Sequence, residues 1–166
     1  MRLLPALALA ALGLDRTVGW APHAVAGRAP ARTRLCAAAR VGVIVVDHGS
    51  RREAANDALA GVAEAYAEAS NMVSIVEAAH MELAAPTVAD AFAACVARGA
   101  TSVVCAPFFL SLGRHVQDDL PRLLAEAAAA HPGVPWILGP PLGQSPLMPR
   151  LLESSVTAAR PGGGAR

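Results

Sequence analysis

The sequence predicts an α/β fold, a four-stranded parallel sheet with helices on both faces. Four short apolar runs rich in β-branched residues alternate with four segments of helical periodicity, and this alternation is typical of parallel sheets joined by right-handed crossovers. The 166 residues suffice for one such domain with a terminal extension. No apolar run long enough to cross a membrane lies beyond residue 40, which excludes a polytopic membrane protein.

The first unit begins with residues 41–46, a continuous apolar run expected of a strand buried on both faces. It ends at Asp47-His48-Gly49-Ser50, and Ser50 with Glu53 forms a predicted capping box. Apolar side chains then step by four and three residues, as in an amphipathic helix. These side chains are Ala55, Leu59, Val62, Tyr66 and Ala69.

The second and third units repeat this pattern of a strand, a polar loop and a helix. Their helices are marked by an early proline and a closing glycine. The expected elements are a strand over 73–79, a helix from Pro86 to Gly99, a strand over 101–106 and a helix with Pro121 in its first turn that ends at 131–133.

The fourth unit is shorter. Residues 135–139 form its expected strand, and Ser145 is the expected N-cap of a last helix with Pro146 at its first position. One face of this helix carries four apolar side chains, Leu147, Leu151, Leu152 and Val156. Residues 159–166 form an expected disordered tail, so the predicted domain spans 41–158.

Residues 1–40 differ from the rest. They hold six arginines and one aspartate, a net charge of +5, which leaves −4 for residues 41–166 out of the total of +1. An apolar run over 3–14 is typical of a signal peptide, and the Arg-rich, acid-poor stretch after it is typical of a transit peptide. We expect a disordered, bipartite targeting presequence of the kind that directs proteins to complex plastids. The alternative is an alanine-rich terminus without a function.

Composition excludes several functions. All fourteen basic residues are arginine, and the net charge near zero argues against a nucleic-acid-binding protein. The three cysteines, Cys36, Cys95 and Cys105, contain no CxxC pair and no disulfide framework, which favours a reducing compartment. Cys95 and Cys105 lie in apolar segments and are expected in the core.

Chemically active side chains gather in the loops that follow the first three predicted strands. In an open parallel sheet, ligands bind beyond the carboxyl ends of the strands. Imidazole and carboxylate together suit Fe, Co, Ni or Zn, so these loops predict a metal-handling site. The side chains concerned are Asp47, His48, Arg51, Arg52, His80, Glu82, Arg114 and His115. For His80 a solvated loop position is the simpler interpretation, and for Asp118 and Asp119 an interaction with the helix dipole.

Three ordered motifs resemble those of one family. Residues 41–52 (VGVIVVDHGSRR), 78–87 (AAHMELAAPT) and 106–115 (APFFLSLGRH), the last followed by DDLP at 118–121, are similar to the small class II chelatases, the sirohydrochlorin chelatase family. The plastid-type sirohydrochlorin ferrochelatases are the most similar members, and sirohydrochlorin cobaltochelatases are related. The resemblance implies a chelatase-like sheet with flavodoxin-type winding.

The resemblance also implies roles for individual residues. His48 and His115 would bind the metal or receive the two pyrrole protons, and Glu82 would complete the metal shell or pass protons on. Arg51, Arg52 and Arg114, with Ser50, would bind the substrate's carboxylates. Because both histidine roles need neutral imidazole, we expect activity to fall below about pH 6.

Further expectations concern cofactors and partners. Sirohydrochlorin and Fe²⁺ are the expected substrates, with Co²⁺ as the alternative metal, and no organic cofactor is expected. No cysteine follows Cys105, so no iron–sulfur cluster is expected. The family's short members work as homodimers, and the mature protein is expected in the plastid stroma, away from membranes and nucleic acid. A cobaltochelatase, a non-catalytic tetrapyrrole or iron carrier, and a hydrolytic zinc enzyme are the competing functions.

Overall fold

A computed structural model describes residues 40–111 and 113–160, without the side chains of 114–116. Four strands form one parallel sheet in the order β2-β1-β3-β4, which confirms the predicted fold class and winding. The elements are β1 (Val41–Asp47), α1 (Glu53–Ala69), β2 (Ile75–His80), α2 (Val88–Ala97), β3 (Ser102–Pro107), α3 (Arg114–Ala129), β4 (Trp136–Leu138), the 3₁₀ turn η1 (Leu142–Gln144) and α4 (Met148–Ala159). The predicted presequence lies outside the described residues, apart from Arg40.

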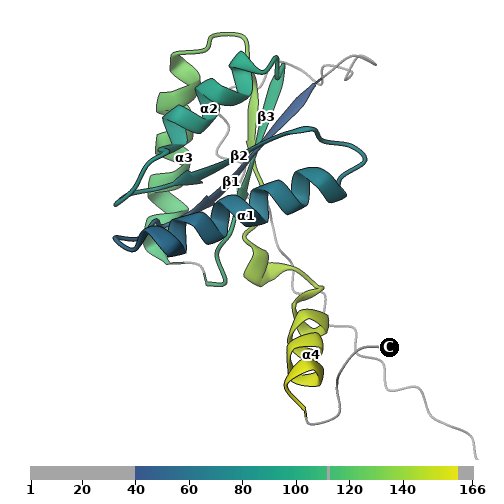
Figure 1. Cartoon of the computed structure of the whole chain (residues 1–166). Helices are drawn as coiled ribbons and strands as arrows, with labels where there is room; N and C mark the ends of the chain where they lie inside the picture. Colours follow the sequence, from purple (N-terminus) through teal and green to yellow (C-terminus); the bar gives the residue numbers. More distant parts are fainter. Residues whose placement is uncertain (1–39, 112, 161–166) are drawn as a thin grey trace, which may run out of the picture.

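Helices cover both faces of the sheet (Figure 1). Helix α1 packs on one face of β1 and β2, where Val43 and Val45 meet Leu59 and Ala63. Helices α2 and α3 pack on the other face and against each other, enclosing the larger apolar cluster. The central strand β1 is therefore buried from both sides, as its unbroken apolar run predicts.

Both described cysteines belong to this core. Cys95 and Cys105 have no exposed surface, as expected from their apolar surroundings. A Cβ on Gly42 would lie 2.9 Å from the Cβ of Cys95, so the glycine allows α2 to pack closely on β1. Burial raises the pKa of the Cys105 thiol to about 12. Burial, with the charge of Glu77 as a smaller cause, raises the pKa of Cys95 to about 12 as well.

The start of helix α1 differs from the prediction. Its N-cap is Arg52, which makes no side-chain capping bond. The Ser50 hydroxyl instead accepts the Arg52 N–H at 3.0 Å, one residue before the helix, so the predicted box of Ser50 with Glu53 is wrong. A capping box does form at the start of α2, where Thr87 and Asp90 bond each other's backbone N–H groups.

Two further helices begin at other residues than the sequence pattern predicts. Helix α3 begins at Arg114, so Pro121 lies inside the helix and not in its first turn. Helix α4 is capped by Leu147, and the Ser145 hydroxyl accepts the Leu147 N–H at 3.2 Å outside the helix. Ser145 is a residue type typical of a helix start, but its side chain bonds the backbone two residues on and does not cap the helix.

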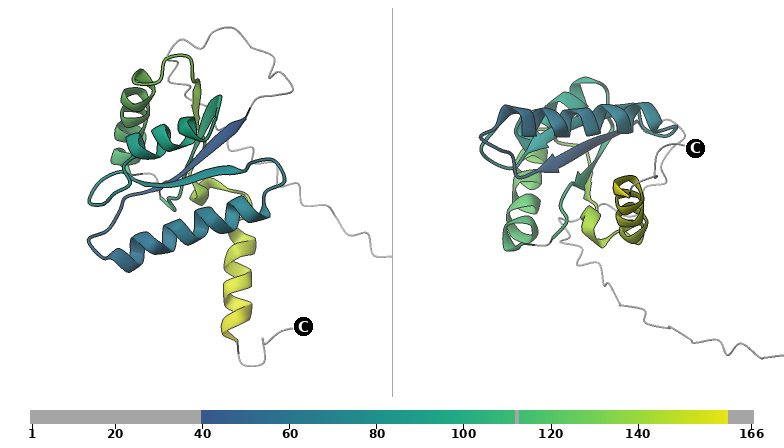
Figure 2. Two further views of the ribbon diagram at one scale, coloured as in Figure 1. Left: turned by 45° about the horizontal axis from the view of Figure 1, so that its top comes forward. Right: turned by 60° about the horizontal axis from the view of Figure 1, so that its bottom comes forward.

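Helix α4 projects away from the sheet (Figure 2) and contacts η1. Its apolar side chains are largely in solvent, with Leu151 57%, Leu152 61% and Val156 56% exposed. On β4, Ile137 is 66% exposed as well. An amphipathic helix and part of a sheet edge therefore lack apolar cover within the described part of the chain. No helix there is long and apolar enough to cross a bilayer.

Candidate functional site

Three loops leave the sheet at one edge, at the carboxyl ends of β1, β2 and β3. Parallel register pairs Asp47 with His80 and Val46 with Pro107, so the strands end side by side. Beyond Pro107, the Phe108 N–H still donates to the Val46 carbonyl at 2.7 Å. The loops that the sequence singles out therefore start from the same place, as expected for a parallel sheet.

The loops after β1 and β2 continue the pairing of their strands. The Met81 N–H donates to the Asp47 carbonyl at 2.9 Å, and the Glu82 N–H donates to the His48 carbonyl at 3.1 Å. These bonds fix the backbones of His48 and Glu82 next to each other. Both side chains belong to exposed residues, so an imidazole and a carboxylate are available at this edge.

Gly49 makes this approach sterically feasible. Its φ is +82°, a conformation that side chains disfavour, and a Cβ would lie 2.1 Å from the carbonyl oxygen of Glu82. No side chain fits into that distance. The glycine of the first motif is thus required by the contact between the two loops.

A phenylalanine of the third loop, Phe109, contacts the ring of His48. The rings of His48 and Phe109 form an edge-on contact with centroids 4.8 Å apart and planes 79° apart. Phe109 itself is 6% exposed and belongs to the core cluster of the α2–α3 side. A buried ring therefore limits the orientations that the exposed imidazole of His48 can adopt.

His80 is not a solvated loop residue, and that interpretation of the sequence is wrong. It is the last residue of β2 and is 2% exposed. Its Nδ1 lies 2.6 Å from Oδ1 of Asp47, the last residue of β1. Since a carboxylate accepts hydrogen bonds, this contact assigns the proton to Nδ1 when the imidazole is neutral. The strand was predicted to end at residue 79, one residue too early to include His80.

The loop that carries Glu82 is short and closed. The His80 N–H donates to the Pro86 carbonyl at 2.8 Å, so the loop returns to the residue from which it starts. Leu83 has φ of +67°, which costs a residue with a Cβ on the order of 1 kcal/mol. Strain of this kind persists where the surroundings determine the backbone, and here it directly follows Glu82.

Arg51 and Arg52 lie at the same edge, before helix α1, and both are exposed. Asn56, which no sequence pattern singles out, holds this turn. Its Oδ1 accepts the Ser50 N–H at 2.9 Å, and its Nδ2 donates to the Ser50 carbonyl at 3.0 Å. An amide six residues after a loop serine carries no recognisable sequence signal. The two bonds of Asn56 fix the turn, and the arginines on it, Arg51 and Arg52, are exposed to solvent.

His115 and Arg114 open helix α3, directly after the third loop. Their side chains lie outside the described part of the structure, so their predicted roles remain predictions. Among the side chains that are described, no three His, Cys, Asp or Glu groups come together as a metal site. The described part of the site is therefore the pair His48 and Glu82, with the arginines beside it. Asp118 and Asp119 lie one turn inside α3, and Asp119 is 3.5 Å from Arg122.

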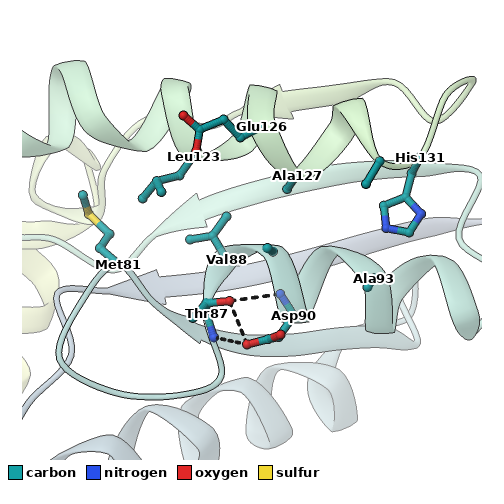
Figure 3. Close-up of a pocket in the computed structure, with 11 residues that line it drawn as sticks. Met81, Thr87, Val88, Asp90, Ala93, Leu123, Glu126, Ala127 and His131 are labelled. Carbon is teal, nitrogen blue, oxygen red and sulfur yellow. Dashed lines mark hydrogen bonds between the residues drawn. The ribbon is translucent and has the colours of Figure 1, made fainter.

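A hollow of about 440 Å³ lies elsewhere, between α2 and α3 (Figure 3). Its walls are mainly small and apolar side chains, with Thr87 and Asp90 bonded to each other at one border. His131 also lines it, and its ring stacks on Phe92 with centroids 5.5 Å apart. The hollow lies on the α2–α3 face and holds none of the predicted site residues.

A family model described as CbiX matches residues 42–159. The chain belongs to the CbiX family. A curated relative, the chloroplastic sirohydrochlorin ferrochelatase of Arabidopsis thaliana, is 46% identical over 107 residues, which are 64% of this chain and 47% of that protein. The sirohydrochlorin cobaltochelatase of Methanococcoides burtonii is 27% identical over 125 residues, 68% of this chain and 92% of that protein.

The fold of this CbiX chain is also found among solved structures. SirB from Bacillus subtilis, solved with Fe³⁺, matches with a TM-score of 0.64 and 27% identity over 74% of this chain and 48% of the SirB chain. The chain thus spans about half the length of the Arabidopsis protein and of SirB. These likenesses establish the family and the fold, and they agree with the resemblance seen in the three motifs.

Proposed function

We propose that this CbiX chain is a sirohydrochlorin ferrochelatase, an enzyme that inserts Fe²⁺ into sirohydrochlorin to form sirohaem and releases two pyrrole protons. The observation that carries the proposal is the pairing of His48 with Glu82 at the carboxyl edge of the sheet. Membership of the CbiX family and the similarity to the Arabidopsis ferrochelatase support it. No organic cofactor and no iron–sulfur cluster takes part in the proposed reaction.

The proposed mechanism assigns metal and proton handling to the paired loops. Metal insertion requires that two N–H protons leave the macrocycle while Fe²⁺ is held over one face. His48 and His115 bind the substrate metal or accept these protons as neutral imidazoles, and Glu82 completes the metal shell or passes protons to solvent. The contact of His48 with Phe109 fixes the imidazole before the substrate arrives.

The arginines provide the proposed contacts to the tetrapyrrole. Sirohydrochlorin carries eight carboxylates, and guanidinium groups bind carboxylates in a two-pronged geometry. Arg51 and Arg52 are exposed on the turn that Asn56 holds, beside His48. With Arg114 and Ser50 they would orient the macrocycle so that its face, and not its rim, meets the metal.

We also propose that the protein works as a homodimer built with helix α4. Four apolar residues of this helix and its cap, Leu147, Leu151, Leu152 and Val156, are more than half exposed, as is Ile137 on β4. In such a dimer, the apolar face of α4 and the exposed Ile137 of one copy would be covered by the same residues of the other copy. A two-fold dimer with an isologous interface is the commonest form of soluble homo-oligomer.

The location that we propose is the plastid stroma. The Arabidopsis relative is named chloroplastic, and residues 1–40 have the composition of a targeting presequence. In this proposal the chelatase domain comprises residues 41–158, and the presequence is removed on import.

Anaerobic turnover tests the proposed activity directly. The full chain is incubated with excess sirohydrochlorin and either Fe²⁺ or, in a parallel sample, Co²⁺, and the visible spectrum is followed. Many turnovers per protein chain are expected, and His48→Ala should abolish them while circular dichroism stays unchanged. A carrier would stop at one equivalent, a cobaltochelatase would turn over with Co²⁺ but not Fe²⁺, and a zinc hydrolase would leave the spectrum unchanged. Any of these three results would overturn the proposal.

A further inference from the structure

The pair formed by His80 and Asp47 has no role in the mechanism above, although it lies directly beneath the site. His80 is the one polar or charged residue among the described residues that is buried at the level of the apolar core. Burying an imidazole costs free energy unless its nitrogens are bonded, and a side chain of similar size could fill the space without that cost. An apolar residue would thus serve packing alone at least as well.

The hydrogen bonds of Asp47 connect the pair to the loop of His48. Its Oδ1 accepts the Gly49 N–H at 2.8 Å and also contacts Nδ1 of His80 at 2.6 Å. One carboxylate oxygen therefore holds both the turn after β1 and the end of β2. His48 lies between Asp47 and Gly49, so its backbone is fixed on both sides.

The hydrogen bonds of His80 connect the pair to the loop of Glu82. The loop starts at His80 and returns to it through the bond from the His80 N–H to the Pro86 carbonyl, 2.8 Å long. A parallel bridge also joins His80 to Thr87. Because His80 forms the base of this loop, any rotation of its backbone would move Glu82.

We propose that Asp47 and His80 form a positioning pair that holds the loops of His48 and Glu82 in the spacing that metal insertion requires. The pair touches neither metal nor tetrapyrrole. It acts through the backbone bonds of Met81 and Glu82 to the carbonyls of Asp47 and His48. This inference rests on the proposed function for its effect on turnover, but the geometry that it invokes can be measured without turnover.

Four substitutions separate positioning from packing. His80→Phe keeps the ring and loses the hydrogen bond to Asp47, whereas His80→Asn loses the ring and keeps an N–H donor near the position of Nδ1. Ile75→Val, at the other end of β2, is the matched control, since Ile75 is equally buried at 3% exposure and far from the loops. Ile75→Ala extends the control to a larger loss of stability.

Two measurements decide the outcome. In His80→Phe we expect kcat to fall about tenfold or more, with the KM for sirohydrochlorin within about twofold, because a misplaced catalytic group costs rate and not carboxylate binding. His80→Asn should recover most of that loss, and the Ile75 variants should keep the wild-type kcat below their melting temperatures. A wild-type kcat in His80→Phe, or an equal loss in Ile75→Ala, would overturn the positioning role.

Hydrogen exchange at single amides keeps the inference separate from the proposed activity. His80→Phe should accelerate exchange of the Gly49 and Glu82 amides about tenfold relative to the wild type, while amides in α3 stay unchanged. If the wild-type protein shows no turnover, the ferrochelatase proposal fails. The exchange rates of the Gly49 and Glu82 amides would still test whether Asp47 and His80 hold the two loops. Unchanged protection of both amides in His80→Phe would refute the positioning pair whatever the activity.

Discussion

The imidazole of His48 meets the ring of Phe109 edge-on, with the ring centroids 4.8 Å apart. One ring is exposed at the candidate site and the other is 6% exposed in the core. The contact connects the loop after β1 to the loop after β3 by side chains, where backbone pairing has ended. It makes the orientation of the exposed imidazole of His48 depend on a ring that belongs to the apolar core.

The first prediction concerns this contact. In Phe109→Leu the imidazole loses its aromatic neighbour and gains rotamers, so kcat should fall about three- to tenfold for a loss of about 1 kcal/mol of aromatic contact. The KM for sirohydrochlorin should hardly change. Phe92→Leu is the control, because Phe92 is a fully buried phenylalanine of the same cluster that stacks on His131 and not on His48. Equal kcat losses in both variants would show that stability alone is responsible.

The second prediction concerns Gly49. In Gly49→Ala the new methyl group would lie 2.1 Å from the carbonyl oxygen of Glu82, on a backbone with φ of +82°. The loops must separate, and we expect a loss of stability of about 2 kcal/mol or more together with a loss of turnover. Gly61→Ala is the control, since a Cβ there meets nothing within 4 Å on an exposed helix. It should raise the melting temperature slightly, as glycine in a helix costs about 1 kcal/mol relative to alanine.

The third prediction follows from the buried thiols. In the folded protein the pKa of Cys95 and that of Cys105 are raised to about 12, whereas an unfolded thiol has its ordinary value near 8.5. Folding thus favours the protonated thiols. The stabilisation is complete below about pH 8.5 and is lost as the pH rises toward 12, by up to about 1.4 kcal/mol per pH unit for each thiol.

Urea unfolding at pH 8 and pH 10, in a Cys36→Ala background, measures this loss. A Cys95→Ala, Cys105→Ala double variant should show a smaller decrease in unfolding free energy between the two values, since its core holds no ionisable thiol. Neither thiol should react with a disulfide reagent at pH 8 until the protein unfolds. If the unfolding free energy decreased equally from pH 8 to pH 10 in the two proteins, the burial of these thiols would be contradicted. Fast reaction of the folded chain with the disulfide reagent would contradict it as well.

The fold and the placement of the first two candidate-site loops could be predicted because they depend on patterns along the chain. The apolar run of β1 indicates a strand buried on both faces, and parallel pairing then brings His48 and Glu82 to one edge whatever the loop details. Helix starts were less predictable, since Ser50 and Ser145 have the right residue type but bond the amide two residues on. The contact between the buried His80 and the half-buried Asp47 was missed because it joins residues 33 apart, and only the register of two strands shows that they meet.

The fourth prediction concerns the arginines before α1. Removing the guanidinium of Arg51 or Arg52 should raise the KM for sirohydrochlorin about tenfold, with kcat within about threefold, because a charge-assisted bond to a carboxylate contributes about 1.5–3 kcal/mol. The effect should shrink at high salt. Arg40→Ala is the control, because Arg40 carries the same charge at the start of β1, at the opposite edge of the sheet. A KM change of the same size there would show that overall charge, and not a local contact, attracts the substrate.

The last prediction concerns the apolar face of α4, which the described part of the chain leaves exposed. Leu151 and Leu152 are 57% and 61% exposed, and full burial of a leucine contributes about 1.5–3 kcal/mol. If a second copy covers them, Leu151→Asp with Leu152→Asp should convert a dimer into a monomer in sedimentation velocity, with the circular dichroism of the sheet domain preserved. Arg150→Asp, which changes charge on the same helix without touching its apolar residues, should leave the dimer intact. A wild-type protein that sediments as a monomer at micromolar concentration would exclude this surface as a dimer contact, and a dimer that survives the double substitution would place the interface elsewhere.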